Sequence, residues 1–131
     1  MAQALLEEIA WKEGIDLEVK SAGIYASDGQ NASMGAVEAL GAEGIDIGAH
    51  RASTVNEKLL KWADLILTMG KSHKKALLSR YDTIENKIYT LKEYAYGIEG
   101  DIADPFGGDI NIYNDTKEEI KNALMHIIKV I

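Results

Sequence analysis

The chain has 131 residues, a formal net charge of −7 from 14 basic and 21 acidic side chains, and no cysteine. A chain of this length is typical of one compact domain, so we expect residues 1–131 to form a single domain. The acidic balance argues against non-specific nucleic-acid binding. The lack of cysteine excludes disulfides, thiolate zinc sites and cysteine nucleophiles within these residues.

Targeting signals are not evident. The first ten residues include Glu7 and Glu8 and have no basic region, which is unlike a signal peptide. No apolar stretch approaches the roughly 20 residues of a membrane-spanning helix. We therefore expect a cytoplasmic protein without membrane contact.

The first half of the chain mixes helical and extended patterns. In chain order it predicts a helix over 1–13, a strand over 15–20, a polar loop over 25–33, a helix from about 33 to 44, and a short extended piece over 45–47. Gly14 is expected to end the first helix, as glycine commonly does.

The second half alternates strands and helices more clearly. A helix is predicted to begin at Thr54, with Thr54 and Glu57 as a capping box. The remaining elements are a buried strand over 64–69, a basic helix over 72–81, a strand over 87–91, a short helix over 92–96, a loop over 101–109 and a closing helix over 112–130.

The alternation of strands and helices predicts an α/β fold, with a parallel sheet covered by helices on both faces. Ligands of such folds bind beyond the carboxyl ends of the strands, often at a helix N-terminus. The chain itself opens on a helix, with neither a strand nor a capping residue ahead of it.

The loop over 101–109 contains the largest group of candidate catalytic residues. It contains Asp101, Asp104 and Asp109, together with the only proline and the only phenylalanine of the chain. One aspartate could serve as a general acid. A turn-rich connector is the alternative, because Asp, Pro and Gly are common turn residues, and composition favours neither interpretation.

Other catalytic motifs are missing. The three histidines, His50, His73 and His126, show no metal-ligand spacing. The sequence has no serine-hydrolase motif, no Walker loop and no Gly-x-Gly-x-x-Gly. We expect neither a metal nor a cofactor.

Several short motifs occur in an order that resembles a known family. They are Ser21-Ala22-Gly23, Gly44-Ile45-Asp46, His50-Arg51-Ala52, the run 64–69 and Asp104-Pro105-Phe106-Gly107. Together they resemble the low-molecular-weight protein tyrosine phosphatases. The stretch from Thr90 to Gly108 is similar to the bacterial branch, which includes protein-arginine phosphatases. The resemblance implies a small doubly wound α/β domain that acts on phosphorylated proteins.

The resemblance also implies roles for individual residues. In the family, a cysteine in a Cys-x5-Arg-Ser-Pro loop attacks phosphorus, and the Asp of Asp-Pro protonates the leaving group. Asp104 corresponds to that acid. Ser21 and His50 correspond to residues that brace the phosphate loop, and Tyr25 and Phe106 to walls of the substrate cleft.

The chain departs from the family in lacking the cysteine and the phosphate-binding arginine. We expect the first strand and phosphate loop to be missing and Met1 to be an internal methionine, which the upstream reading frame would test. The 131-residue chain is expected to be inactive, because a proton donor alone contributes only about 10²–10⁴-fold.

Two functions stay open at this point. One is phosphatase action on phosphotyrosine or phosphoarginine, and the other is a non-catalytic binding or regulatory module on the same scaffold. Arsenate reduction coupled to thioredoxin is disfavoured, because it needs further cysteines. The preference between phosphotyrosine and phosphoarginine is not decided by these residues.

Overall fold

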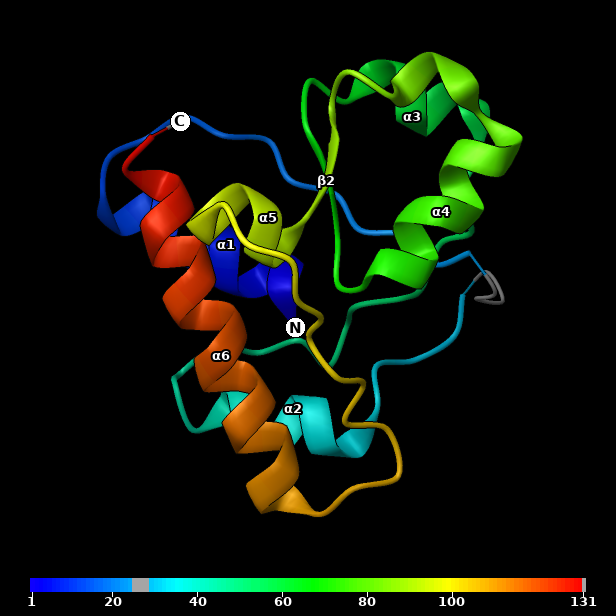
Figure 1. Cartoon of the computed structure of the whole chain (residues 1–131). Coiled ribbons are helices and arrows are strands. Elements are labelled where there is room, and N and C mark those ends of the chain that lie inside the picture. The colour runs from blue at the N-terminus through cyan, green and yellow to red at the C-terminus, as the bar shows by residue number, and fades with distance from the viewer. Residues whose placement is uncertain (25–28, 131) are drawn as a thin grey trace.

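The computed structural model describes residues 1–24 and 29–130 (Figure 1). Its elements in chain order are α1 (Ala2–Lys12), α2 (Met34–Gly41), α3 (Glu57–Trp62), β1 (Ile66–Thr68), α4 (Lys71–Arg80), a 3₁₀ turn (Asp82–Ile84), β2 (Ile88–Thr90), α5 (Leu91–Tyr96) and α6 (Ile110–Ile128). Gly14 has a φ of +70° directly after α1, so the predicted helix stop is confirmed.

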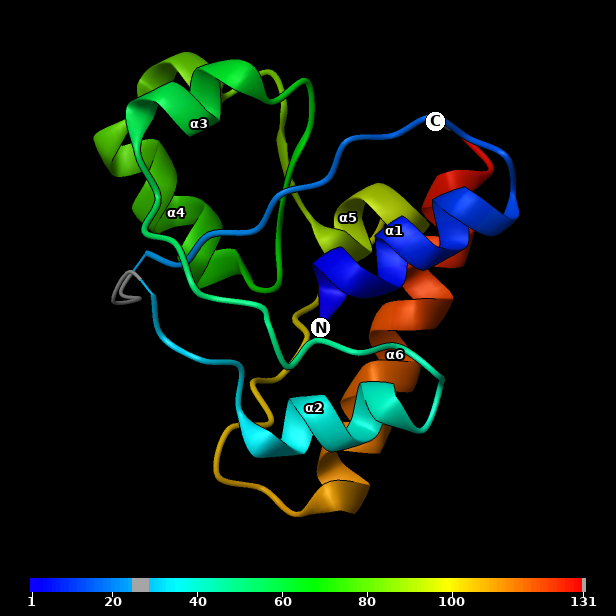
Figure 2. The same cartoon turned by 180° about the vertical axis from the view of Figure 1, so that it is seen from behind.

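A parallel pair of strands separates two groups of helices. β1 pairs with β2 in the register Ile66 to Ile88 and Thr68 to Thr90. Helices α3 and α4 lie on one side of the pair, and α1, α5 and α6 lie on the other (Figures 1 and 2). Ile66 and Ile88 pack into the first group, whereas Leu67 packs toward the second. The predicted α/β class, with helices on both faces of a parallel sheet, is confirmed.

The long helix α6 lies at the centre of the larger core. Helices α1, α2 and α5 pack against it. The Asp109 carboxylate accepts a hydrogen bond from the Ile112 N–H and so caps its N-terminus. The inward positions expected from helical periodicity are buried, and they are Ile120, Leu124, Ile127 and Ile128. No helix in the described part of the chain is long and apolar enough to cross a membrane.

The strand predicted over 15–20 is wrong. Ile15, Leu17 and Val19 are half-buried and the residues between them are exposed, so the expected alternation is present. Within the described residues, however, this extended segment belongs to no ladder. The extended piece predicted over 45–47 also forms no strand. Alternation predicts which side chains are half-buried, but a strand also needs a hydrogen-bonded neighbour.

The capping box predicted at Thr54 and Glu57 is also wrong. The side chain of Asn56 caps α3 by accepting a hydrogen bond of 2.8 Å from the Leu59 N–H. Thr54 forms an isolated bridge with Gly23 instead. Asparagine is at least as good an N-cap as threonine, so the helix begins at the later site.

A reciprocal capping box occurs at α5 instead, where none was predicted. The Glu93 N–H donates to the Thr90 Oγ1 at 3.1 Å, and the Thr90 N–H donates to the Glu93 Oε1 at 2.9 Å. Thr90 is the last residue of β2, so the end of the strand and the start of the helix are joined without a loop.

A close approach between α2 and α6 depends on Gly35. A Cβ atom at Gly35 would clash with the Tyr113 ring. Tyr113 is only 6% exposed, so its ring has little room to move away. Gly35 therefore allows the two helices to pack without an intervening side chain.

We expect Gly35→Ala to lower the free energy of unfolding by about 1–3 kcal/mol, because the new methyl group overpacks the core against Tyr113. Urea denaturation followed by far-UV circular dichroism measures the change. Gly41→Ala in the same helix is the control: its Cβ meets nothing within 4 Å. Equal stability of the two variants would contradict the close approach.

Candidate active site

The loop between α5 and α6 folds into a tight turn around Asp104. The Asp104 Oδ1 accepts a hydrogen bond of 3.0 Å from the Phe106 N–H, and the Gly108 N–H donates to the Pro105 carbonyl at 2.8 Å. Gly107 has a φ of +83°, which glycine adopts without strain. The turn leaves Asp104 exposed, and the Phe106 ring is 78% exposed beside it.

The other two carboxylates of this loop cap helices. The Asp101 Oδ1 accepts a hydrogen bond of 2.9 Å from the Lys71 N–H at the start of α4. The Asp109 Oδ1 accepts one of 3.0 Å from the Ile112 N–H at the start of α6. Among residues 1–24 and 29–130, the Asp104 carboxylate is held only within its own turn. Asp104 is therefore the one of the three that does not cap a helix.

The first part of the loop is fastened to the carboxyl end of β1. The Ile102 N–H donates to the Met69 carbonyl at 2.8 Å, and the Ile102 side chain is buried. In both views the loop then passes the N-terminal end of α1 on its way to α6 (Figures 1 and 2). The carboxyl end of a strand is where α/β folds place their ligands.

Ser21 is bound to the first turn of α1. Its hydroxyl donates to the Gln3 Oε1 at 2.6 Å, and the Gln3 Nε2 donates to the Val19 carbonyl at 3.3 Å. This helix has no side-chain cap and no acidic residue in its first turn. The contact fixes the segment before Gly23 against the beginning of the helix.

His50 is half-buried in a turn, where its N–H donates to the Ile47 carbonyl at 3.0 Å and its own carbonyl accepts from the Arg51 guanidinium at 2.8 Å. No hydrogen bond of its imidazole ring is found among residues 1–24 and 29–130. Tyr25 lies outside the described residues. The bracing role of His50 and the cleft role of Tyr25 therefore stay predictions.

The predicted site residues fall into two groups. Asp104 and Phe106 share one turn, whereas Ser21 is tied to α1 through Gln3. No hydrogen bond joins the two groups in the described part of the chain. Among the same residues, no cluster of three or more His, Asp or Glu side chains could hold a metal ion.

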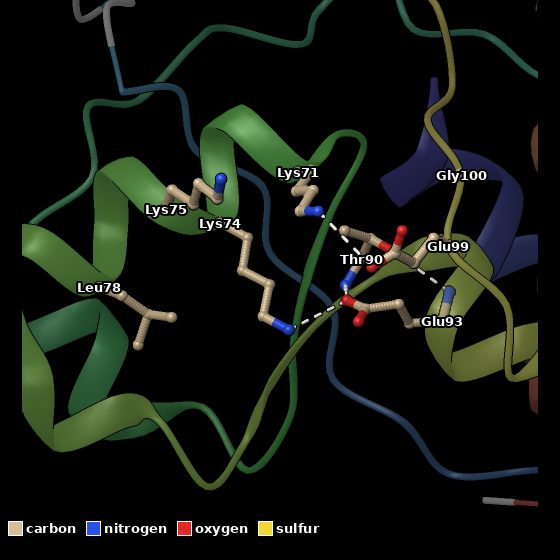
Figure 3. A pocket seen from close by; sticks show the side chains of 8 residues that line it. All are labelled: Lys71, Lys74, Lys75, Leu78, Thr90, Glu93, Glu99 and Gly100. Carbon is tan, nitrogen blue, oxygen red and sulfur yellow. Dashed lines mark hydrogen bonds and ion pairs between the residues drawn. The ribbon is translucent and has the colours of Figure 1, made fainter.

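A hollow of about 240 Å³ lies next to this loop, between the start of α4 and the start of α5 (Figure 3). Lys74 pairs across it with Glu93, with 3.0 Å between the Nζ and Oε1 atoms. The hydrogen bond from the Thr90 N–H and the Lys74 ammonium hold the pKa of Glu93 below its ordinary value. Glu93 therefore stays ionised at neutral pH and neutralises Lys74.

Two residues of this region were not singled out from the sequence. Asp101 was grouped with the other two aspartates of the loop. Its role as a helix cap follows from a contact with a residue 30 positions away in the sequence. Gly70 precedes α4 and offers no side chain, which was a sign that the cap must come from elsewhere. No feature of the sequence indicated the hydrogen bond between Gln3 and Ser21.

We expect Asp101→Ala to lower the free energy of unfolding by about 0.5–2 kcal/mol, because α4 loses its only side-chain cap among the described residues. Asp101→Asn should lose less, since its amide oxygen can still accept from the Lys71 N–H. Urea denaturation measures both. An alanine variant as stable as the parent chain would contradict the capping role.

Comparison with known proteins gives a consistent result. The family described as "low molecular weight phosphotyrosine protein phosphatase" matches residues 1–131. The predicted N-terminal truncation is not borne out by this match, which spans the chain. The chain is 42% identical over 129 residues to the protein-arginine-phosphatase of Bacillus subtilis, covering 98% of this chain and 85% of that protein.

Solved structures agree. A low molecular weight protein tyrosine phosphatase from T. tengcongensis superposes with a TM-score of 0.95 at 42% identity, covering 99% of this chain and 88% of that one. An arginine phosphatase mutant with a phosphorylated active-site serine superposes with a TM-score of 0.96 at 41% identity, covering 98% and 84%. The predicted fold class is thus confirmed a second time.

Proposed function

The chain belongs to the low molecular weight phosphotyrosine protein phosphatase family, and we propose that residues 1–131 form the scaffold and proton donor of a protein phosphatase. The family and its relatives are hydrolases that act on phosphorylated proteins. Phosphotyrosine and phosphoarginine are the two substrate classes. Relatives named for each are 42% identical to this chain, so identity favours neither.

Asp104 is the proposed general acid. The observation that supports it is the difference between the three carboxylates of the loop: Asp101 and Asp109 cap helices, whereas Asp104 accepts its hydrogen bond within its own turn. In the proposed reaction, a nucleophile forms a bond to phosphorus as the bond from phosphorus to the leaving oxygen or nitrogen breaks. Asp104 gives its proton to that leaving atom and later takes one from the attacking water.

The same turn supplies an aromatic surface. Phe106 follows two residues after Asp104, and its exposed ring is suited to pack beside a substrate side chain. Ser21 and His50 are the proposed braces of a phosphate-binding loop, with Ser21 already held against the first turn of α1. Tyr25 is proposed as a second wall of the cleft on the family resemblance alone.

The nucleophile is what this chain lacks, because it has no cysteine. A general acid by itself contributes about 10²–10⁴-fold, which is far below the rate enhancement of a typical enzyme. The 131-residue chain alone is therefore proposed to be inactive. A non-catalytic binding module remains the alternative, and the exposed Asp104 favours the phosphatase, because a binding module has no use for a proton donor.

The purified 131-residue chain should not hydrolyse para-nitrophenyl phosphate, a phosphotyrosine peptide or a phosphoarginine peptide above the buffer rate. Release of inorganic phosphate measures each reaction. Ordinary turnover of any of the three would contradict the proposal that the chemistry needs a cysteine thiolate.

A chimera can supply the missing groups. It would carry a strand and a loop of the family form, Cys-x5-Arg-Ser-Pro, ahead of Met1, and we expect it to hydrolyse at least one of the two phosphopeptides. Asp104→Asn in the chimera should lower kcat for that peptide by about 10²–10⁴-fold, because the leaving group loses its proton donor.

The control lies in the same loop. Asp109→Asn keeps a good N-cap for α6 and should leave kcat close to that of the parent chimera. Equal losses in the two variants would contradict the role of Asp104. A folded chimera without any turnover would favour the binding module.

A further inference from the structure

The exposed face of α4 carries positive charge that the proposed phosphatase chemistry does not use. The helix holds four of the 14 lysines and arginines of a chain with a net charge of −7, and it contains no Asp or Glu. Its only deeply buried side chain is Leu77, so one face packs inward and the opposite face is open to solvent. A local basic face on an acidic protein attracts acidic partners.

The positive charges on this helix are not equally free. Lys74 is 23% exposed and is neutralised by Glu93. Lys71 is 54% exposed, and its partner Glu99 lies 3.5 Å away at 82% exposure, which makes a weak surface pair. Lys75 is exposed and makes no ion pair among residues 1–24 and 29–130. Figure 3 shows Lys75 pointing away from the pair of Lys74 and Glu93.

Lys71 and Lys75 lie on the same side of the helix, one turn apart. Residues four apart on a helix are neighbours, so these two like charges repel each other. No residue of α4 between them is acidic. Among the described residues, Glu99 pairs with Lys71 and not with Lys75. An acidic group placed over both would relieve that repulsion and pair with each of them.

This face begins at the loop that carries Asp104. Asp101 accepts a hydrogen bond from the Lys71 N–H, so the loop and the start of α4 are in direct contact. Three residues lead from Asp101 to Asp104, which is at most about 10 Å of chain. A phosphorylated residue at Asp104 would therefore lie close to the start of α4.

We propose that Lys71 and Lys75 dock an acidic segment of the phosphorylated protein substrate, a proposal that rests on the proposed function. An extended peptide advances about 3.3 Å per residue, and Lys71 and Lys75 are about 6 Å apart along the helix. Acidic side chains about three and five residues from the phosphorylated residue would fit the two lysines.

The test begins with binding, which needs no turnover. A phosphotyrosine peptide with Glu at three and five residues after the phosphotyrosine is titrated into the ¹⁵N-labelled 131-residue chain. We expect amide shifts over Lys71–Arg80 and a Kd that rises about 3–10-fold in the double variant Lys71→Ala, Lys75→Ala. Raising the salt concentration should weaken binding of the parent chain.

Matched controls separate specific docking from general charge. The double variant Lys58→Ala, Lys61→Ala removes two exposed lysines of α3 and should leave the Kd unchanged. The same peptide with Gln in place of Glu should bind the parent chain as weakly as the Glu peptide binds the α4 variant. The proposal would be overturned if the α3 variant lost as much affinity as the α4 variant. It would also be overturned if the parent chain bound the Gln peptide as tightly as the Glu peptide. Equally tight binding of a single-stranded oligonucleotide would also overturn it, in favour of a general polyanion surface.

Kinetics of the chimera separate this proposal from the proposed function. The α4 variant should lower kcat/KM for the Glu peptide about 3–10-fold through KM and leave para-nitrophenyl phosphate unchanged, because that substrate does not reach α4. If the chimera hydrolyses both the Glu peptide and para-nitrophenyl phosphate, and the α4 substitutions change neither rate, the docking proposal is overturned and the catalytic proposal stands. A chimera that hydrolyses neither, with peptide binding still dependent on α4, overturns the catalytic proposal instead.

Discussion

The hydrogen bond from the Lys71 N–H to the Asp101 carboxylate joins the start of α4 to the loop that carries Asp104. On one side it caps α4, which has no capping side chain of its own because Gly70 precedes it. On the other side it fixes the start of the loop that carries Asp104. The backbone bond from Ile102 to Met69 supports the same junction. The proposed general acid and the basic face of α4 therefore share one anchor at the carboxyl end of β1.

The loop after α5 shows how three similar side chains acquire different roles. Asp101 and Asp109 are held by backbone N–H groups at helix starts, where a carboxylate also interacts favourably with the helix dipole. Within the part of the chain that the structure describes, the Asp104 carboxylate is bound only to the Phe106 N–H of its own turn, and it faces solvent. A proton donor needs this freedom, because it must reach a leaving group. The proposed proton donor is thus present, while these 131 residues contain no cysteine to supply a thiolate.

The features that could be predicted from the sequence are those that local patterns report. The apolar run over 64–69 indicated β1 because buried parallel strands are continuously apolar, and the periodicity of the last helix indicated its inward face. The strand over 15–20 was wrong because alternation reports half-burial and not pairing. The cap of α3 was misplaced because Thr54 and Asn56 are both good caps, and the choice depends on the bridge between Thr54 and Gly23. Asp101 could not be told from Asp104, since its partner is 30 residues away in the chain.

We propose above that Asp104 donates a proton to the leaving group. The most direct measurement compares phenyl phosphate, which has a basic leaving group, with para-nitrophenyl phosphate, which has a weakly basic one, in the chimera with and without Asp104→Asn. Protonation matters most for the more basic leaving group. If Asp104 is the proton donor, Asp104→Asn should lower kcat much more for phenyl phosphate than for para-nitrophenyl phosphate. An equal loss for both substrates would contradict it.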